Sequence, residues 1–239
     1  MDSKNKIFLG IITARGGSKG LPRKNIKSLA GRPLIHYTFQ AAKASKLMNR
    51  CIVSSEDEEI INFSINQNME VPFIRPAELA NDEVKSIDVL IHAMQFLREK
   101  EGYKPDYIIT LQPTSPLRTG IDIDNSIKLI INNPEADSLV SVIQAPHNFN
   151  PYSIMKLNVN YIEHFIKMDK EIMRRQEKPI FYARNGAAIY ISSYNLIMKQ
   201  KKIIGENCLA YIMPKERSID IDDYYDWEIA EFLIKKNQS

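Results

Sequence analysis

The sequence contains little cysteine and histidine. Its 239 residues include only two cysteines and four histidines. Cys51 and Cys208 lie far apart and form no metal-ligand pair, so we expect both to be reduced thiols of a cytoplasmic protein. The histidines show no ligand spacing. These scarce residues therefore argue against a metal site built from cysteine and histidine.

Signals for a membrane, for export and for nucleic acid are also missing. No apolar run approaches the roughly 20 residues that a membrane span needs. The first residues, Met-Asp-Ser-Lys-Asn-Lys, lack the apolar core of a signal peptide. The formal net charge is only +3, and the basic residues are scattered rather than gathered in a stripe. We therefore expect a soluble cytoplasmic protein that binds neither membranes nor nucleic acid.

The composition is that of one globular domain, with 44% hydrophobic and 26% charged residues. Short apolar runs alternate with helical patterns through the first 143 residues. This alternation predicts an α/β fold, a mostly parallel sheet flanked by helices. An S-x-x-E capping box at Ser55 predicts the start of one helix. The expected strands are 7–13, 51–54, 71–74 (at an edge, because of Pro72), 107–111 and 138–143, and the expected helices include 33–46, 87–97 and 121–131.

The pattern changes after residue 143. Hairpin strands are expected within 152–167, so residues 1–239 would form one domain with an insertion at roughly 145–180. Further apolar runs at 180–183, 187–192 and 208–213 are expected strands, and an Asn-Gly turn lies between the first two. An amphipathic helix with Trp227 on its apolar face ends the chain.

A cationic, glycine-rich loop follows the first strand. It reads Ala14-Arg15-Gly16-Gly17-Ser18-Lys19-Gly20, and Arg23 and Lys24 come directly after it. Glycines let the backbone approach a ligand closely, and the cations match phosphate oxygens. The loop fits neither G-x-G-x-x-G nor G-x-x-x-x-G-K-[ST]. The pattern predicts a polyphosphate site, and the alternative is a solvated surface turn.

Two aspartates near the C-terminus form a second candidate site. Asp220 and Asp222 alternate with isoleucines, and in an extended strand both carboxylates point to one side. Two carboxylates suit Mg²⁺ when phosphates and waters complete its coordination. The alternative is a helix N-terminus capped by Asp222 or Asp223. Capping alone would explain Asp223, but it does not apply to Asp220.

Other candidates are weaker taken singly. Gln112, Thr114 and Ser115 follow a predicted strand at the end where open α/β sheets bind ligands. They could read a base edge or cap the next helix. Arg75 could hold a phosphate or a sugar hydroxyl, or be solvated. The Arg174-Arg175 pair suits an acidic substrate, or forms a solvated charged face. No G-x-S-x-G motif supports covalent acyl chemistry.

Five stretches recur in a characteristic order: ARGGSKGLPRKN at 14–25, LQPTSPLRTG at 111–120, RRQ at 174–176, RNGA at 184–187 and SIDID at 218–222. Together they resemble the acylneuraminate cytidylyltransferases, also called CMP-sialic acid synthetases. The resemblance spans nearly the whole chain. It implies a Rossmann-like α/β domain and a homodimer whose insertions complete the neighbouring active site. It also implies that CTP and a nine-carbon keto sugar acid give a CMP-sugar and pyrophosphate, with Mg²⁺ required.

The same resemblance implies roles for single residues. Catalytic roles fall on Arg15, Lys24, Asp220 and Asp222, with the two aspartates holding Mg²⁺. The expected nucleotide contacts are Ala14, Arg15, Gly16, Ser18, Lys19, Lys24, Asn25 and Arg75. The expected contacts in the substrate cleft are Gln112 near the sugar, Thr114, Ser115, Arg118, Asn185, Arg174 and Arg175. The resemblance allows the last two to come from either subunit of the dimer. No general base is evident.

Two departures from the family pattern matter. The family often shows V-S-T-D where this chain has Val53-Ser54-Ser55-Glu56. Beyond RRQ, the segment 145–178 does not match, which leaves a sialic, legionaminic or pseudaminic acid open as the substrate. Two other functions are alternatives: a synthetase for the eight-carbon acid 3-deoxy-manno-octulosonate on the same fold, and a nucleotide-binding regulator without catalysis.

Overall fold

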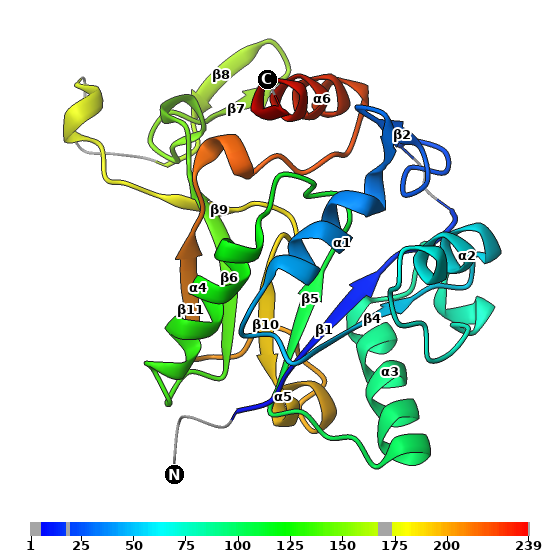
Figure 1. The fold of residues 1–239 in the computed structure, drawn as a ribbon. Coiled ribbons are helices and arrows are strands. Elements are labelled where there is room, and N and C mark those ends of the chain that lie inside the picture. Colours follow the sequence, from blue (N-terminus) through cyan, green and yellow to red (C-terminus); the bar gives the residue numbers. More distant parts are fainter. Residues whose placement is uncertain (1–5, 18–19, 167–173, 239) are drawn as a thin grey trace.

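A computed structural model describes residues 6–17, 20–166 and 174–238 of the protein. Its centre is a seven-stranded sheet in the order β11-β6-β10-β5-β1-β4, with β9 paired to β6 (Figure 1). Five of the seven strands run in the same direction, and β9 and β10 run antiparallel to their partners. The predicted mostly parallel sheet is confirmed. The strands are β1 Phe8–Thr13, β4 Arg50–Ser54, β5 Tyr107–Leu111, β6 Ser138–Gln144, β9 Tyr182–Arg184, β10 Tyr190–Ser193 and β11 Cys208–Ile212.

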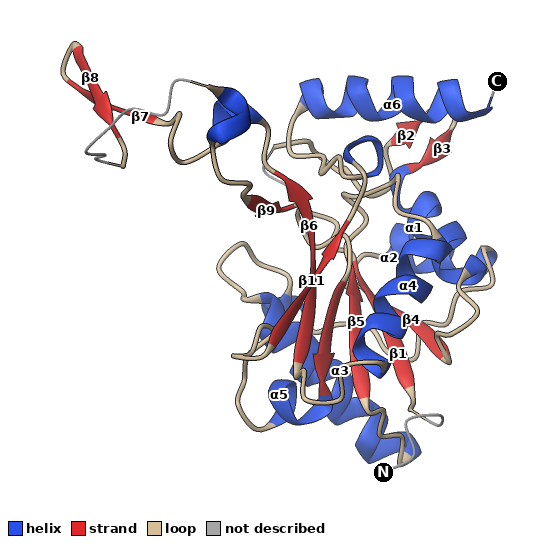
Figure 2. Cartoon of the chain, turned by 90° about the vertical axis from the view of Figure 1, so that its left-hand side faces the viewer, coloured by secondary structure: helices blue, strands red, loops and turns tan. Residues whose placement is uncertain are grey.

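Helices cover both faces of the sheet (Figures 1 and 2). Alternate residues of β1 enter two separate cores, Phe8 and Ile12 in one and Leu9 and Ile11 in the other. This explains why its sequence is continuously apolar. The first core is closed by α1 Leu34–Ala44, α2 Glu58–Asn66 and α4 Gly120–Ile131, and the second by α3 Ser86–Glu101 and α5 Tyr194–Met198. None of the helices in the described ranges is long and apolar enough to cross a bilayer.

The last helix, α6 Tyr224–Gln238, lies across the top of the molecule beside a small ribbon, β2 Ser28–Leu29 and β3 Arg32–Pro33 (Figure 2). Trp227 of α6 belongs to a third apolar cluster together with Leu21 and Ile221. Leu21 comes from the cationic segment and Ile221 from the acidic segment. The packing of α6 therefore holds these two segments together.

A hairpin of β7 Met155–Asn158 and β8 Tyr161–His164 projects from the body of the molecule (Figure 2). It lies within the hairpin region predicted at 152–167. Its apolar side chains are exposed, and Leu157 lies opposite Ile162 in the register. Short 3₁₀ turns, η3 His147–Phe149 and η4 Arg175–Glu177, lie within the range predicted for the insertion, roughly 145–180.

Two predictions of local structure are wrong. Residues 71–74 form no strand, and only Glu70 makes an isolated bridge, to Ile52. Pro72 lacks the N–H that a continued ladder needs. The cap of α2 is Asp57, whose side chain accepts a hydrogen bond from the Ile60 N–H, and not Ser55. The helix begins at Glu58, so Asp57 is the residue that immediately precedes it.

Candidate active site

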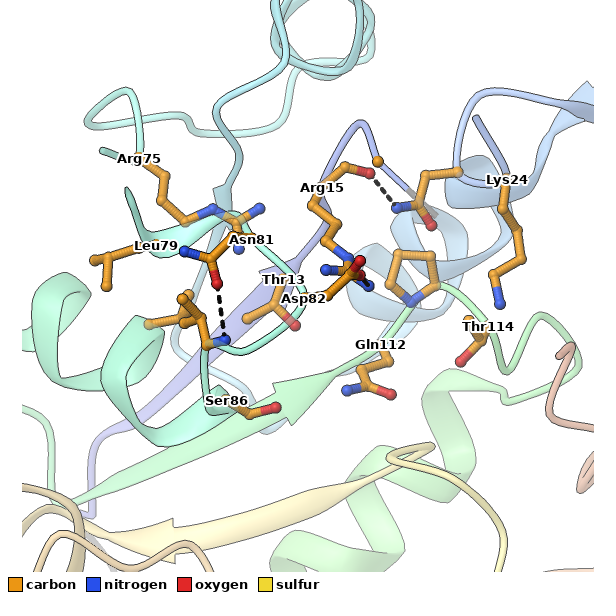
Figure 3. Close-up of a pocket in the computed structure, with 15 residues that line it drawn as sticks. Thr13, Arg15, Lys24, Arg75, Leu79, Asn81, Asp82, Ser86, Gln112 and Thr114 are labelled. Carbon is orange, nitrogen blue, oxygen red and sulfur yellow. Dashed lines mark hydrogen bonds and ion pairs between the residues drawn. The ribbon is translucent and has the colours of Figure 1, made fainter. Parts of the chain in front are cut away.

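Three connecting segments, those after β1, between α2 and α3, and after β5, meet at the carboxyl edge of the parallel strands, where open α/β sheets bind ligands. They surround a cavity of about 280 Å³. Figure 3 shows Arg15, Lys24, Gln112 and Thr114 around this space. The predicted cationic loop and the loop after β5 therefore share one cavity. Its lining is Thr13, Arg15, Gly17, Lys24, Asn25, Arg75, Leu79, Asn81, Asp82, Val84, Ser86, Val89, Gln112, Pro113 and Thr114.

The backbone of the cationic loop is held by a buried ion pair. Arg75 donates from Nη2 to the Ala14 carbonyl at 2.6 Å and to Glu56 Oε2 at 2.7 Å. The other oxygen of Glu56 accepts from the Gly16 N–H at 2.7 Å. Burial lowers the pKa of Arg75, and Glu56 opposes that shift. Glu56 stands at the position where the family often has aspartate, and it fixes the cationic loop to the end of β4. Arg75, which holds the same loop, also lines the cavity.

Other groups fix the loop from outside. Asn25 donates to the Arg15 carbonyl at 2.9 Å. Arg23 pairs with Asp57 at 3.0 Å and with Glu59 at 2.6 Å, at the start of α2. A Cβ on Gly16 would lie 2.3 Å from Asp57 Oδ2, so this close approach requires glycine. The predicted contacts of Ser18 and Lys19 lie outside the described residues.

The acidic segment lies beside this loop, but it is not a strand. Ile221 donates its N–H to the Thr114 carbonyl at 2.8 Å, and its side chain is fully buried. Burial raises the pKa of Asp220, a hydrogen bond with the Thr114 side chain opposes the shift, and the charge of Asp222 adds to it. Asp222 is exposed. The segment therefore presents one half-buried and one exposed carboxylate next to the cavity wall.

The residues present fit a hard cation. Asp220 Oδ1 is buried and has no hydrogen-bond partner among the described residues. Asp223 caps α6 by accepting from the Asp226 N–H at 3.0 Å, so the cap leaves Asp222 available. The described residues contain no group of three or more histidine, cysteine, aspartate or glutamate side chains suited to a metal. A cation here would need oxygens from a phosphate and from water, which is the usual pattern for Mg²⁺.

Lys24 connects the two walls. Its ammonium group donates to the Ile221 carbonyl, and it lines the cavity. Burial lowers the pKa of Lys24, while Asp222 and Asp220 favour its charged form.

Arg118 lies beneath the cleft rather than in it. Its buried guanidinium donates to the Gln112 carbonyl at 3.2 Å, to the Ala188 carbonyl at 2.5 Å and to Thr38 Oγ1 at 2.6 Å. Burial lowers its pKa to about 10. Ser115 is also buried, with no partner for its hydroxyl among the described residues. The motif residue Arg118 therefore supports Gln112 from inside the fold.

A second cavity, of about 530 Å³, adjoins the first at Gln112, which lines both. Its other lining residues are Arg184, Gly186, Ala187 and Tyr190. Burial raises the pKa of Tyr190, and Arg184 opposes the shift. Asn185 is buried beside it and donates to Ser218 Oγ at 3.1 Å, so it anchors the acidic segment.

Arg174 of the RRQ motif lies in the predicted insertion. Its side chain is exposed, and its Nη1 lies 3.6 Å from Glu177 Oε1. Within one chain, neither Arg174 nor Gln176 is among the lining residues of the two cavities. The predicted contact of the Arg175 side chain lies outside the described part of the structure.

Sequence reasoning missed the segment before α3. Asn81, Asp82, Val84 and Ser86 line the first cavity, and Arg15 Nη2 pairs with Asp82 Oδ1 at 2.8 Å (Figure 3). The sequence feature that could have indicated this segment is the polar run directly before the amphipathic helix α3. Nothing in that run, however, indicates that it faces Arg15, which is far away in the sequence.

The sequence of the chain is also similar to those of known proteins. Residues 9–221 match the family model described as "Cytidylyltransferase". The chain is 34% identical over 231 residues to the N-acylneuraminate cytidylyltransferase of Escherichia coli O18:K1:H7, covering 96% of this chain and 52% of that protein. It is 32% identical over 234 residues to the CMP-N,N'-diacetyllegionaminic acid synthase of Legionella pneumophila, covering 97% of each.

The fold also has a solved counterpart. The structure of a CMP:2-keto-3-deoxy-manno-octonic acid synthetase complexed with CTP superposes with a TM-score of 0.71. It covers 97% of this chain and 99% of that chain, at 16% sequence identity. At this identity the similarity shows the fold alone.

Proposed function

Because the chain belongs to the cytidylyltransferase family and is thus a nucleotidyltransferase, we propose that it activates a nonulosonic acid with CTP. The reaction gives a CMP-sugar and pyrophosphate. The relatives named for acylneuraminate and for a legionaminic acid support this substrate class. The observation that carries the proposal is the meeting of the cationic loop and the Asp220–Asp222 segment beside one cavity at the carboxyl edge of the sheet.

The chemistry requires positioning and charge neutralisation above all. The anomeric hydroxyl of the sugar acid attacks the α-phosphorus, and the bond from that phosphorus to the bridging oxygen of pyrophosphate breaks in line. Arg15 and Lys24 would stabilise the charge on the α-phosphate and on the departing pyrophosphate. Glu56 and Arg75 would hold the loop that carries Arg15. We assign no general base.

Cytidylyltransferases of this kind generally use a divalent metal, and we assign Mg²⁺ to Asp220 and Asp222. A bound cation favours the ionised carboxylate and so would offset the effect of burial on Asp220. Held by these two carboxylates, Mg²⁺ would supply charge neutralisation at the α-phosphate and would favour ionisation of the attacking hydroxyl. The unpartnered buried oxygen of Asp220 supports this assignment.

The two adjoining cavities suggest separate places for the two substrates. We place CTP in the cavity lined by Arg15, Lys24 and Asn25, and the sugar acid in the one lined by Arg184 and Tyr190. Gln112 lines both and would lie between the reacting groups. The Arg184 guanidinium matches the carboxylate of a sugar acid.

We also propose a homodimer in which the projecting hairpin packs against a second copy. Its exposed apolar side chains favour burial against a partner. This arrangement would carry Arg174 and Arg175 towards the neighbouring active site. The exposed hairpin residues include Met155, Leu157, Val159, Tyr161 and Ile162.

The direct test is pyrophosphate release from CTP and Mg²⁺ with a panel of sialic, legionaminic and pseudaminic acids. The eight-carbon acid 3-deoxy-manno-octulosonate belongs in the panel, because its synthetase has this fold. We expect turnover with at least one nine-carbon acid and its loss in Asp222→Asn. No release with any member, from a folded dimer, would refute the proposal. Calorimetric CTP binding that ignores Mg²⁺, without turnover, would instead support a regulator.

A further inference from the structure

An acidic side chain occupies part of the proposed phosphate site. Asp82 Oδ1 lies 2.8 Å from Arg15 Nη2, and both residues line the cavity with Lys24. Figure 3 shows the two side chains against each other in the middle of the site. Their side chains are 39% and 35% exposed, so a ligand can reach the pair.

A phosphate and the Asp82 carboxylate compete for the same donors. Arginine binds a carboxylate and a phosphate oxygen through the same planar set of N–H groups. A polyphosphate that reaches Arg15 also brings several negative charges next to Asp82, which repels them. Binding of a phosphate to Arg15 therefore requires the ion pair to separate.

The turn that carries Asp82 is closed without help from Arg15. The Asn81 side chain accepts from the N–H groups of Glu83 at 3.0 Å and Val84 at 3.1 Å. Its amide also donates to the Glu78 carbonyl at 2.9 Å. These local bonds place the turn immediately before α3. Separation of Asp82 from Arg15 therefore breaks none of these hydrogen bonds of the turn.

The other cations near the cavity have different partners. Lys24 donates to a neutral carbonyl, that of Ile221, and Arg75 is held by Glu56 beneath the loop. Arg23 pairs with α2 outside the cavity. Arg15, in contrast, pairs with an acidic residue that itself lines the cavity.

We propose that Asp82 is an internal counter-ion of the phosphate site. It pairs with Arg15 in the free enzyme, is displaced by the triphosphate of the nucleotide, and pairs again when pyrophosphate leaves. The pairing weakens the binding of every anion at Arg15, and it helps pyrophosphate to dissociate because Arg15 has a partner to return to. The identity of the anion rests on the proposed function.

The test compares Asp82→Asn with Glu83→Gln by calorimetry, using inorganic pyrophosphate, CTP and uncharged cytidine. Glu83→Gln removes the same charge one residue away and is not among the cavity-lining residues. We expect Asp82→Asn to tighten pyrophosphate and CTP binding by about 5- to 10-fold, as for loss of a partly exposed ion pair and of like-charge repulsion. Cytidine binding should not change, and thermal unfolding should confirm that both variants are folded.

A second arm asks whether the effect passes through Arg15. In an Arg15→Ala background, Asp82→Asn should tighten pyrophosphate binding clearly less than it does in the wild type, because the ion pair is gone and only the like-charge repulsion remains. In turnover assays, Asp82→Asn should strengthen product inhibition by pyrophosphate. A merely structural role of Asp82 would not produce this set of effects.

Three results would overturn the proposal. The first is weaker pyrophosphate binding in Asp82→Asn, as expected if Asp82 helped to hold the metal and phosphates. The second is an equal effect of Asp82→Asn and Glu83→Gln, and the third is no pyrophosphate binding at all. Failure of the proposed function is distinguishable, because it appears as absent turnover with every sugar acid while the calorimetric difference between the variants remains.

Discussion

The ammonium group of Lys24 donates a hydrogen bond to the backbone carbonyl of Ile221, the residue between Asp220 and Asp222. The two segments are nearly two hundred residues apart in the sequence, and this bond joins them. Leu21 and Ile221 pack in one apolar cluster. Because the same packing holds both segments, the cations proposed to bind phosphate and the carboxylates proposed to bind a metal keep a fixed relation. The core thus contributes to the positioning of both groups.

The neighbouring aspartates Asp222 and Asp223 should behave differently. Asp222→Asn should lower turnover by about 10²-fold or more while the fold stays intact, because it removes a charge-stabilising group. Asp223→Asn should change little, since asparagine also caps a helix, and Asp223→Ala should cost about 1 kcal/mol of stability and spare turnover. Steady-state kinetics and urea unfolding of the three variants measure this. Equal loss of turnover in Asp222→Asn and Asp223→Asn would contradict the assignment.

Gly186 makes room for the Asp220 carboxylate. A Cβ at this position would lie 2.2 Å from Asp220 Oδ2. Gly186→Ala should therefore displace the carboxylate and lower turnover by about 10²-fold. Gly31→Ala is the matched control, because Gly31 also has positive φ, at +83°, but open space around it. Each variant should lose about 1–2 kcal/mol of stability from backbone strain. If both kept full turnover, Gly186 would have no role in positioning Asp220.

An ion pair between Arg217 and buried Asp122 anchors the start of the acidic segment to α4. Arg217 donates to both carboxylate oxygens, at 3.0 and 2.9 Å. Burial alone would raise the pKa of Asp122, but hydrogen bonds from Arg217 and Thr119 outweigh it and lower the pKa. Arg217→Met leaves a buried carboxylate with fewer partners. This substitution should lower the free energy of unfolding by about 3 kcal/mol. That value is at the low end of the range for breaking a buried ion pair, because the Arg217 side chain is one-third exposed.

The pH dependence of that loss follows from the lowered pKa of Asp122. A carboxyl whose folded pKa is depressed contributes stability above its ordinary pKa, near 3.9, and loses it as the pH falls through the folded value. The difference in unfolding free energy between the wild type and Arg217→Met should thus be full at pH 7 and shrink below about pH 4. Lys215→Met, which removes an exposed cation two residues earlier, is the control. A difference that grows towards acid pH would contradict this account.

The sequence predicts those features that depend on local pattern. The continuous apolar run of β1, the periodic stripe of α3 and the loops after parallel strands all follow from residue order, and with them the position of Arg15, Lys24 and Gln112 at one edge. The resemblance to the family also selects Arg118 as a residue of the substrate cleft. It does not reveal the direction of the side chain, which depends on whether Thr38 and Ala188 surround it.

Contacts between distant segments account for most of what was missed. The Arg75–Glu56 pair joins residues 19 apart, and its geometry depends on how the end of β4 packs against the loop after β1. The Arg15–Asp82 pair joins two loops whose neighbourhood is set only by the complete sheet. The wrong strand at 71–74 has a local cause instead, because the proline that suggested an edge strand also removes a donor.

The projecting hairpin should decide the oligomeric state. Leu157 and Ile162 lie opposite each other on its strands and are 74% and 67% exposed. We expect a dimer of the wild-type protein in light scattering, and a monomer of the Leu157→Glu/Ile162→Glu variant, because two charges directly opposite each other would be buried unpaired in the interface. If the partner completes the active site, turnover of this monomer should fall by about 10²-fold, with the KM for the sugar acid rising more than that for CTP. Ile65→Glu, an exposed position on α2, should leave both properties unchanged. A wild type that is monomeric and active would rule out completion of the site by the partner.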